Sequence, residues 1–153
     1  LQAAGATMSN SASIFNMART NIAALLGPTY KEHTDLFEVE DINANTLENG
    51  YSVVLLDAEE RSPQVNAIFM QRTLKVVMTH RTYASVDAGK VIVTLATVYD
   101  KEAAAIESFR TWSDDTIGLI KALPVTKSKI EKFAGGEDSF LVNTLEFTIL
   151  YKN

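Results

Sequence analysis

Hydrophobic residues recur along this chain at two different periods, and the longer period predicts two helices. In residues 9–27 they repeat at steps of three and four, which places them on one face of a helix that a Gly-Pro pair would end. These residues are Ile14, Met17, Ala18, Ile22, Leu25 and Leu26. A second stripe predicts a long helix over residues 101–123, begun by Asp100 and ended by Pro124. Its members are Ile106, Phe109, Trp112 or Ser113, Ile117, Ile120 and Leu123, and a kink or a break into two helices at residues 113–115 is an alternative.

The shorter period, alternation of apolar and polar residues, predicts β-strands. Residues 51–57 are apolar on both faces, which is typical of a central strand. Residues 72–83 and 90–99 are rich in β-branched residues, and the four residues 86–89 between them include a glycine, so the two segments predict a hairpin. A last strand is expected from Phe140 to Tyr151, close to the final residue of the chain. We expect its end to be held by a neighbouring strand.

Residues 58–71 break the alternation and are predicted to form a long loop. The segment begins with Glu59, Glu60 and Arg61 and then carries a proline and a run of apolar residues. These apolar residues are Val65, Ile68, Phe69 and Met70. Connections between neighbouring elements usually have about 2–6 residues, and longer ones are often functional. We expect this loop to be mobile in the free protein and to dock on a partner; the alternative is that its apolar residues fold back onto the core.

Together these elements predict an α+β domain. We expect a mostly antiparallel sheet of four to five strands, packed by the N-terminal helix and by a long helix before the final strand. Residues 35–40 are expected to add a short strand, and residues 126–136 a short helical turn. Residues 1–8 are expected to be a vector-derived remnant and the native start, and residues 9–153 a single domain.

The composition excludes several classes of function. The chain has 153 residues, a net charge of −5, a pI near 5.0 and no cysteine. An acidic protein without a basic stripe is not expected to recognise nucleic acid. No window approaches the roughly 18 apolar residues that a membrane helix needs. Without cysteine there is no disulfide framework and no thiolate ligand, which fits folding in a reducing cytosol.

The residues that could carry chemistry do not form a recognisable motif. His33 and His80 are the only histidines and lack the spacing of a metal site. Two groups of carboxylates could do acid–base work or hold a cation, but helix-start and solvated charges explain them equally well. The groups are Asp57 with Glu59 and Glu60, and Asp114 with Asp115. We therefore expect no catalytic residue, metal or cofactor.

The order of elements resembles that of the tail terminator proteins of long-tailed bacteriophages. The resemblance covers residues 9–153 and rests on the first helix ("SIFNMARTNIAALLG"), on the junction before the long helix ("ATVYDKEAAAIESF") and on the closing strand ("LEFTILYKN"). It implies a non-catalytic protein that forms a ring, typically a hexamer, on the finished tail tube. Such a ring ends tube polymerisation and offers a surface for joining the head.

The resemblance also implies partners and a location. The partners are other copies of the chain, the tail tube protein and a head-completion or neck protein. The location is the head-proximal end of the virion tail, after assembly in the bacterial cytoplasm. Nine residues are candidates for these interfaces. They are Glu59, Glu60, Arg61, Val65, Ile68, Phe69, Met70, Trp112 and Tyr151.

Two other functions remain open from the sequence. One is another neck role, as a head-completion or head–tail connector protein, which is also small and ring-forming. The other is a small soluble α+β enzyme or ligand-binding domain, which predicts a deep pocket with converging polar groups and perturbed pKa values.

Overall fold

The computed structural model describes residues 9–33, 49–64, 67–81, 88–110, 112, 119–135 and 138–152. For residues 59–64, 67–69, 88–93, 119–127, 132–135 and 138–139 it describes the backbone alone. Predictions that concern residues 1–8, 35–40, Val65 and residues 114–115 lie outside the described residues.

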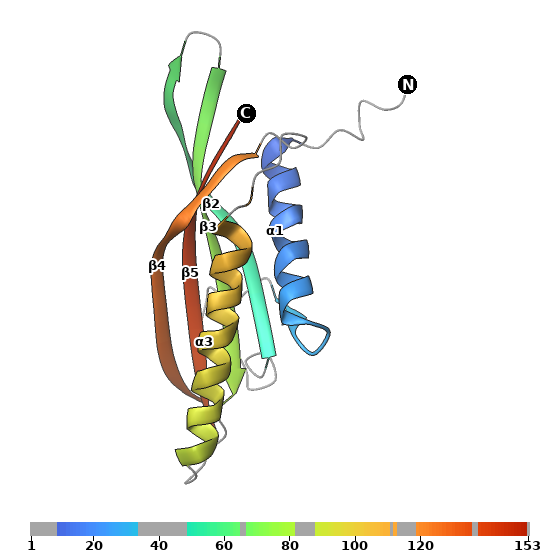
Figure 1. The fold of residues 1–153 in the computed structure, drawn as a ribbon, viewed down its shortest axis with the longest axis vertical. Helices are drawn as coiled ribbons and strands as arrows, with labels where there is room; N and C mark the ends of the chain where they lie inside the picture. Colours follow the sequence, from blue (N-terminus) through green and yellow to red (C-terminus); the bar gives the residue numbers. More distant parts are fainter. Residues whose placement is uncertain are drawn as a thin grey trace.

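The chain folds into two helices and a five-stranded sheet, which confirms the α+β prediction (Figure 1). The elements are α1 (Asn10–Leu26), β1 (Lys31–Glu32), β2 (Asn49–Gln64), β3 (Ala67–Arg81), α3 (Ala88–Arg110), β4 (Leu119–Gly135) and β5 (Asp138–Lys152).

The sheet has the strand order β1-β2-β3-β5-β4, so the last strand of the chain lies inside the sheet. β2, β3, β5 and β4 pair in antiparallel fashion, and only the two-residue β1 runs parallel to its neighbour β2. β3 and β5 are paired without a register shift from Phe69↔Lys152 to Arg81↔Phe140. This uninterrupted ladder is the centre of the sheet.

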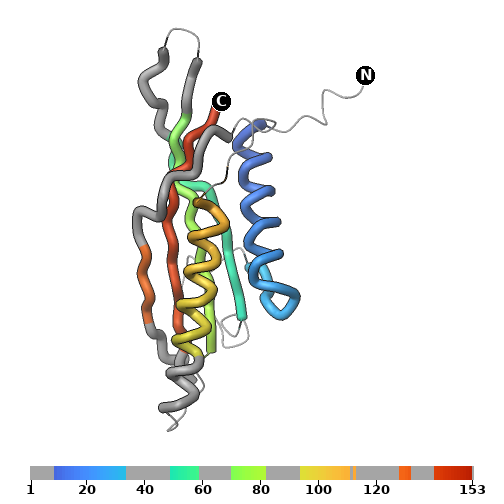
Figure 2. Tube along the Cα trace, in the orientation of Figure 1, coloured from blue at the N-terminus to red at the C-terminus, as the bar shows by residue number. Residues whose placement is uncertain are grey.

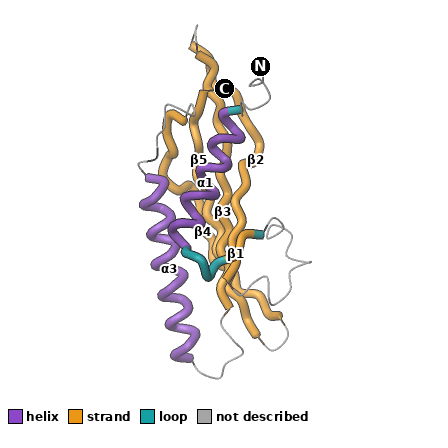
Figure 3. Tube along the Cα trace, turned by 90° about the vertical axis from the view of Figure 1, so that its right-hand side faces the viewer, coloured by secondary structure: helices purple, strands orange, loops and turns teal. Residues whose placement is uncertain are grey.

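Both helices pack on the same face of the sheet (Figure 3). Alternate residues of the central strands point to that face and are buried, as the period of two requires. The shared core consists of Ile14, Ala18, Ile22 and Leu26 of α1, Tyr51 and Val53 of β2, Leu74, Val76 and Met78 of β3, Ala105 and Phe109 of α3, and Leu145, Phe147, Ile149 and Tyr151 of β5.

α1 confirms the first predicted helix almost to the residue. The Ser9 side chain accepts a hydrogen bond from the Ala12 N–H at 3.2 Å, which satisfies a donor of the first turn. Gly27 ends the helix with a φ of 88°, a conformation that favours glycine, and its N–H bonds to the Ala23 carbonyl at 3.0 Å. The predicted strands at 51–57 and from Phe140 to Tyr151 are also confirmed, as is most of 72–83.

The prediction of a loop over residues 58–71 is wrong. β2 continues to Gln64 and β3 starts at Ala67, and the two strands pair as one long hairpin up to Gln64↔Ala67. A register shift between Leu55 and Ala58 and another between Arg61 and Gln64 interrupt the regular ladder. These irregularities explain why the alternation of apolar residues fails here although the backbone remains extended.

The predicted strand at 90–99 and its hairpin through residues 86–89 are also wrong, because residues 88–110 form α3. β-branched residues lower helix propensity only slightly, and packing overrides that preference. Val98, Ala105 and Phe109 are fully buried and lie seven and four residues apart, which is the spacing of one helix face.

The predicted helix over 101–123 ends at Arg110, and residues 119–135 form β4 in place of the last helical turns. The short helical turn expected over 126–136 is wrong for the same reason. Pro124 suits β4 because this strand lies at the edge of the sheet and is shifted in register between Ala122 and Val125. The long helix therefore precedes the last two strands and not only the final one.

Alternation along β5 yields a test of this core. Phe147→Ala should lower the free energy of unfolding by about 3–5 kcal/mol, because it leaves a cavity between the sheet and α3. The neighbouring Thr148, half-buried on the opposite face, should tolerate alanine with a loss under about 1 kcal/mol. Urea unfolding of both variants measures the difference. Equal losses would contradict the assigned faces.

Candidate assembly site

The hairpin end of the sheet, where β2 turns into β3, collects most of the predicted interface residues. Glu60 lies opposite Met70, and Arg61 lies opposite Phe69. Tyr151 of β5 in turn lies opposite Met70 on the other side of β3. Residues from three strands thus meet at one end of the molecule, where the hairpin extends past the other strands (Figure 1). The structure therefore brings residues that were predicted to lie in a loop together with Tyr151 of the last strand.

Met70 and Tyr151 belong to the packed interior. Met70 is half-buried against the core, so the alternative interpretation, folding back onto the core, is confirmed for this residue. Tyr151 is 1% exposed and is part of the core itself. Trp112 packs against the core from the end of α3, with its ring 5.2 Å from that of Phe109. For these three residues, a role at an interface remains a prediction.

Arg72 joins the hairpin to the rest of the fold. Its guanidinium donates from Nη1 to the Leu56 carbonyl at 2.8 Å, where the β2 register is shifted, and from Nε to the Tyr151 hydroxyl at 2.9 Å. Ser11 Oγ, at the start of α1, bonds to the same hydroxyl at 3.0 Å. One tyrosine oxygen therefore connects α1, β3 and β5.

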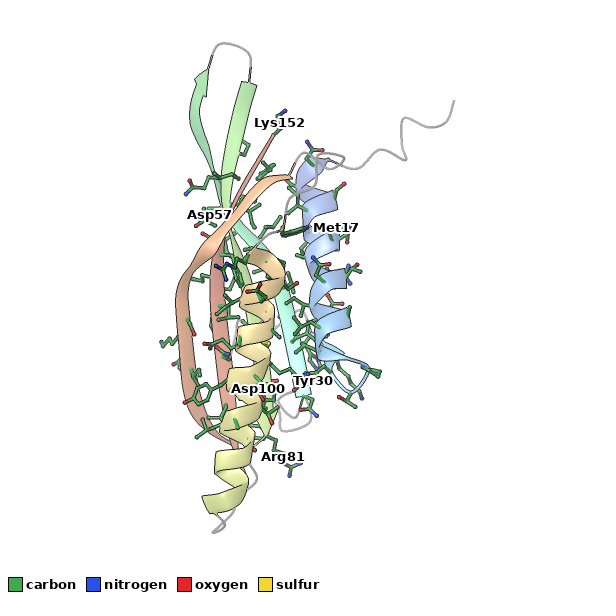
Figure 4. The ribbon with its side chains drawn as sticks, viewed as in Figure 1. Met17, Tyr30, Asp57, Arg81, Asp100 and Lys152 are labelled. Atoms are coloured by element: carbon green, nitrogen blue, oxygen red, sulfur yellow. The ribbon has the colours of Figure 1, made fainter. Side chains whose placement is uncertain are left out.

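The end of β5 lies beside the start of α1 (Figure 2). Asn10 Nδ2 donates to the Lys152 carbonyl at 2.8 Å, next to the bond between Ser11 and Tyr151. Figure 4 shows Lys152 at the hairpin end, above Asp57. The expectation that a neighbour holds the last strand is met within the chain, by β3 on one side, β4 on the other and α1 above.

His80 lies buried at the end of the sheet opposite the hairpin end. The sequence pattern did not predict its burial or its partner. His80 is 3% exposed; a 2.6 Å hydrogen bond joins its Nε2 to the Tyr30 hydroxyl, and the two rings meet edge to face. Burial lowers the pKa of His80 to about 4, and the nearby Lys101 ammonium acts in the same direction. Nδ1 is buried without a partner among the described residues. This histidine is therefore neutral at pH 7; its predicted non-catalytic role stays a prediction.

Two further polar contacts tie the helices to the sheet. Glu102 of α3 accepts hydrogen bonds from Ser128 Oγ of β4 at 2.8 Å and from Asn143 Nδ2 of β5 at 3.0 Å. Arg19 of α1 donates from Nη2 to Glu32 of β1 at 2.8 Å. This hydrogen bond lowers the pKa of Glu32 and raises that of Arg19. Both contacts hold a helix against the sheet.

Within the described residues, no three or more His, Cys, Asp or Glu side chains gather at a spacing that could hold a metal ion. None of the helices described is both long and apolar enough to cross a membrane. The described geometry thus offers strand edges and a projecting hairpin as its distinctive surfaces.

Comparison with known proteins adds a structural relative. The chain is similar in fold to a chain from the solved structure entitled "Virion of native gene transfer agent (GTA) particle", with a TM-score of 0.56 and 13% sequence identity over 100% of both chains. No family model matches the sequence. No curated protein matches it either. At this identity the similarity establishes a shared fold.

The Tyr151 contacts generate one prediction. Tyr151→Phe removes only the hydroxyl that Ser11 and Arg72 share, so it should cost about 1–3 kcal/mol of unfolding free energy. Tyr151→Ala also removes the ring from the core and should cost about 3–5 kcal/mol. Chemical denaturation compares the two, with the exposed Lys152→Ala as control. If Tyr151→Phe matches the parent, the hydroxyl contacts carry no stability.

His80 generates a second prediction. Its folded-state pKa lies below the ordinary value of 6.5, so the unfolded chain binds the proton more readily than the folded one. The His80 contribution should be constant above pH 6.5 and should fall by about 1.4 kcal/mol per pH unit as the pH drops toward 4. The total loss should be about 3 kcal/mol.

The measurement is urea unfolding at several pH values for the parent and for His80→Gln. Carboxylates titrate in both proteins, so the difference between their stabilities isolates the histidine. That difference should shift in favour of the variant as the pH falls. A difference that does not change with pH would show that His80 is protonated equally in the folded and unfolded chains.

Proposed function

We propose that this chain is a structural protein of a virion, of the tail terminator type. It forms a ring on the finished tail tube, ends the growth of the tube and offers a surface to the head-completion or neck protein. The function includes no chemical step and no cofactor. The ring is a hexamer in this proposal and lies at the head-proximal end of the tail.

The observation that carries the proposal is the full-length fold similarity to a chain of a gene transfer agent virion. It is independent of the resemblance to tail terminators, which rests on the sequence of residues 9–153. Both point to an assembled particle. The fold itself adds a physical argument. The paired strands β3 and β5 form its centre, so two strand edges and the hairpin end remain available for contacts with other proteins.

The hairpin end is the surface that we assign to the tube. It extends past the other strands (Figure 1). The apolar residues Ile68 and Phe69 belong to this end of β3, with Phe69 paired to Lys152. The Arg72 contacts to Leu56 and Tyr151 hold the base of the hairpin against the sheet. A projecting hairpin with a fixed base can dock without reorganisation of the core.

Tube growth tests the proposal. Purified tail-tube protein should polymerise into shorter tubes of uniform length when this chain is added, and electron microscopy should show a cap at one end. Tubes of unchanged length distribution without a cap would contradict the proposal and favour a neck role on the head side.

Two hairpin variants sharpen the experiment. Ile68→Ser with Phe69→Ser should remain folded and cap tubes poorly if the hairpin end docks. Met70→Ser is the matched control, because Met70 packs against the core. It should lose about 2–5 kcal/mol of stability. Normal capping by the folded double variant would exclude the hairpin end as the tube contact.

A further inference from the structure

Polar side chains form a row across the sheet beneath α3, at the end opposite the hairpin end. Two of them are buried: His80 of β3 is 3% exposed, and its neighbour in the row, Asn143 of β5, is 0% exposed. Tyr30, which immediately precedes β1, lies at one end of the row, and Ser128 of β4 lies at the other. Because the strand order is β1-β2-β3-β5-β4, the row runs across the sheet from Tyr30 to Ser128. α3 packs against β3, β5 and β4.

The two halves of the row are hydrogen-bonded separately. In one half, His80 Nε2 and the Tyr30 hydroxyl are 2.6 Å apart. In the other half, Asn143 Nδ2 and Ser128 Oγ both donate to one carboxylate oxygen of Glu102, at 3.0 and 2.8 Å. A carboxylate accepts hydrogen bonds, so the amide of Asn143 turns its Nδ2 toward Glu102 and its Oδ1 away from it.

Each half leaves one buried polar atom in the middle of the row. These atoms are His80 Nδ1 and Asn143 Oδ1, and neither has a partner among the described residues. The ring nitrogens of a histidine point in widely diverging directions, so Nδ1 faces β5 when Nε2 faces Tyr30. Oδ1 of Asn143 faces β3, since the Nδ2 of the same amide is directed to α3 and β4. The two unpartnered atoms therefore face each other across the β3–β5 ladder.

The strand register sets the separation between these two side chains. Asn143 lies opposite Met78, and His80 lies opposite Leu141, so His80 and Asn143 are diagonal neighbours on the same face of the sheet. Diagonal neighbours are about 7–8 Å apart, and their Cβ atoms are somewhat closer. Nδ1 and Oδ1 are not within hydrogen-bonding distance of each other. This spacing suits one water molecule, which bridges buried polar groups by making two to four hydrogen bonds.

We propose that a single buried water binds between His80 Nδ1 and Asn143 Oδ1. It joins the two halves into one hydrogen-bonded chain from Tyr30 to Ser128. Buried polar groups in folded proteins nearly always have a partner, and this water supplies one to both atoms. The chain then connects the link between α1 and β1 with three strands and α3. It holds this end of the molecule together within one copy, so the inference is independent of the proposed ring and tube.

A high-resolution crystal structure of the full chain tests the water directly. The expected result is electron density for one water at hydrogen-bonding distance, about 2.7–3.2 Å, from both His80 Nδ1 and Asn143 Oδ1. A direct hydrogen bond between the two side chains would overturn the proposal. So would a different partner for either atom, such as a backbone carbonyl or a water that touches only one of them.

The juxtaposition of the two side chains is tested by NMR titration of His80 in Asn143→Asp. A carboxylate that faces Nδ1 favours the charged imidazole, so the pKa of His80 should rise by about one to three units from its value of about 4. The other groups at the ring, the Tyr30 hydroxyl and the Lys101 ammonium, are the same in parent and variant.

Thr144→Asp is the matched control. Thr144 follows Asn143 in β5, lies opposite Val77 and is half-buried on the other face of the sheet. The substitution adds the same charge without facing Nδ1, so it should shift the pKa of His80 much less. Equal shifts in the two variants would overturn the proposed arrangement. The crystal structure uses the parent chain, so it decides the proposal even if Asn143→Asp does not fold.

Discussion

The pairing of β3 with β5 is the interaction on which the rest of this structure depends. It is the longest ladder without a register shift, and its inward side chains, such as Leu74 opposite Phe147 and Val76 opposite Leu145, are fully buried. Both helices bury their apolar stripes against the face that these side chains form. Because β3 and β5 form the centre of the sheet, β4 lies at one edge, and β1 with the continuation of β2 lies at the other.

This arrangement links stability to assembly. The apolar residues of the core pack against one another within a single copy. The polar contacts of Tyr151, Glu102 and Arg19 hold the helices on the sheet. What remains outside is a pair of strand edges and a hairpin that extends past the other strands (Figure 1). The proposed role, contact with other copies and with the end of a tube, requires such surfaces and a core that does not change when they are used.

The sequence predicts the elements whose pattern and local signals agree. The first helix has an apolar stripe and a Gly-Pro end, and β5 has an unbroken alternation, so both are found where expected. The errors occur where tertiary packing opposes the local preference. The β-branched run before Asp100 forms a helix because Val98 continues the buried stripe of Ala105 and Phe109. Residues 119–135 form a strand because β5 offers a partner that no local signal reveals.

At the candidate site, too, the sequence predicts some features, and others depend on tertiary packing. The residues around the hairpin end were identified by composition, but their arrangement as paired strands depends on a bulge that breaks the period of two. The contacts of Arg72 with Leu56 and of Ser11 with Tyr151 join residues far apart in the chain and have no signature in a single sequence. Which strands lie at the edges is known only once the strand order is known.

Locating the chain in the assembled particle tests the central claim most directly. Because the sequence has no cysteine, Ala103→Cys on the exposed side of α3 provides a single attachment site for a gold label. Electron microscopy of particles from the cells that encode the chain should place the label at the junction of head and tail. Label distributed along the tube or over the head, or particles that contain no label, would contradict the account.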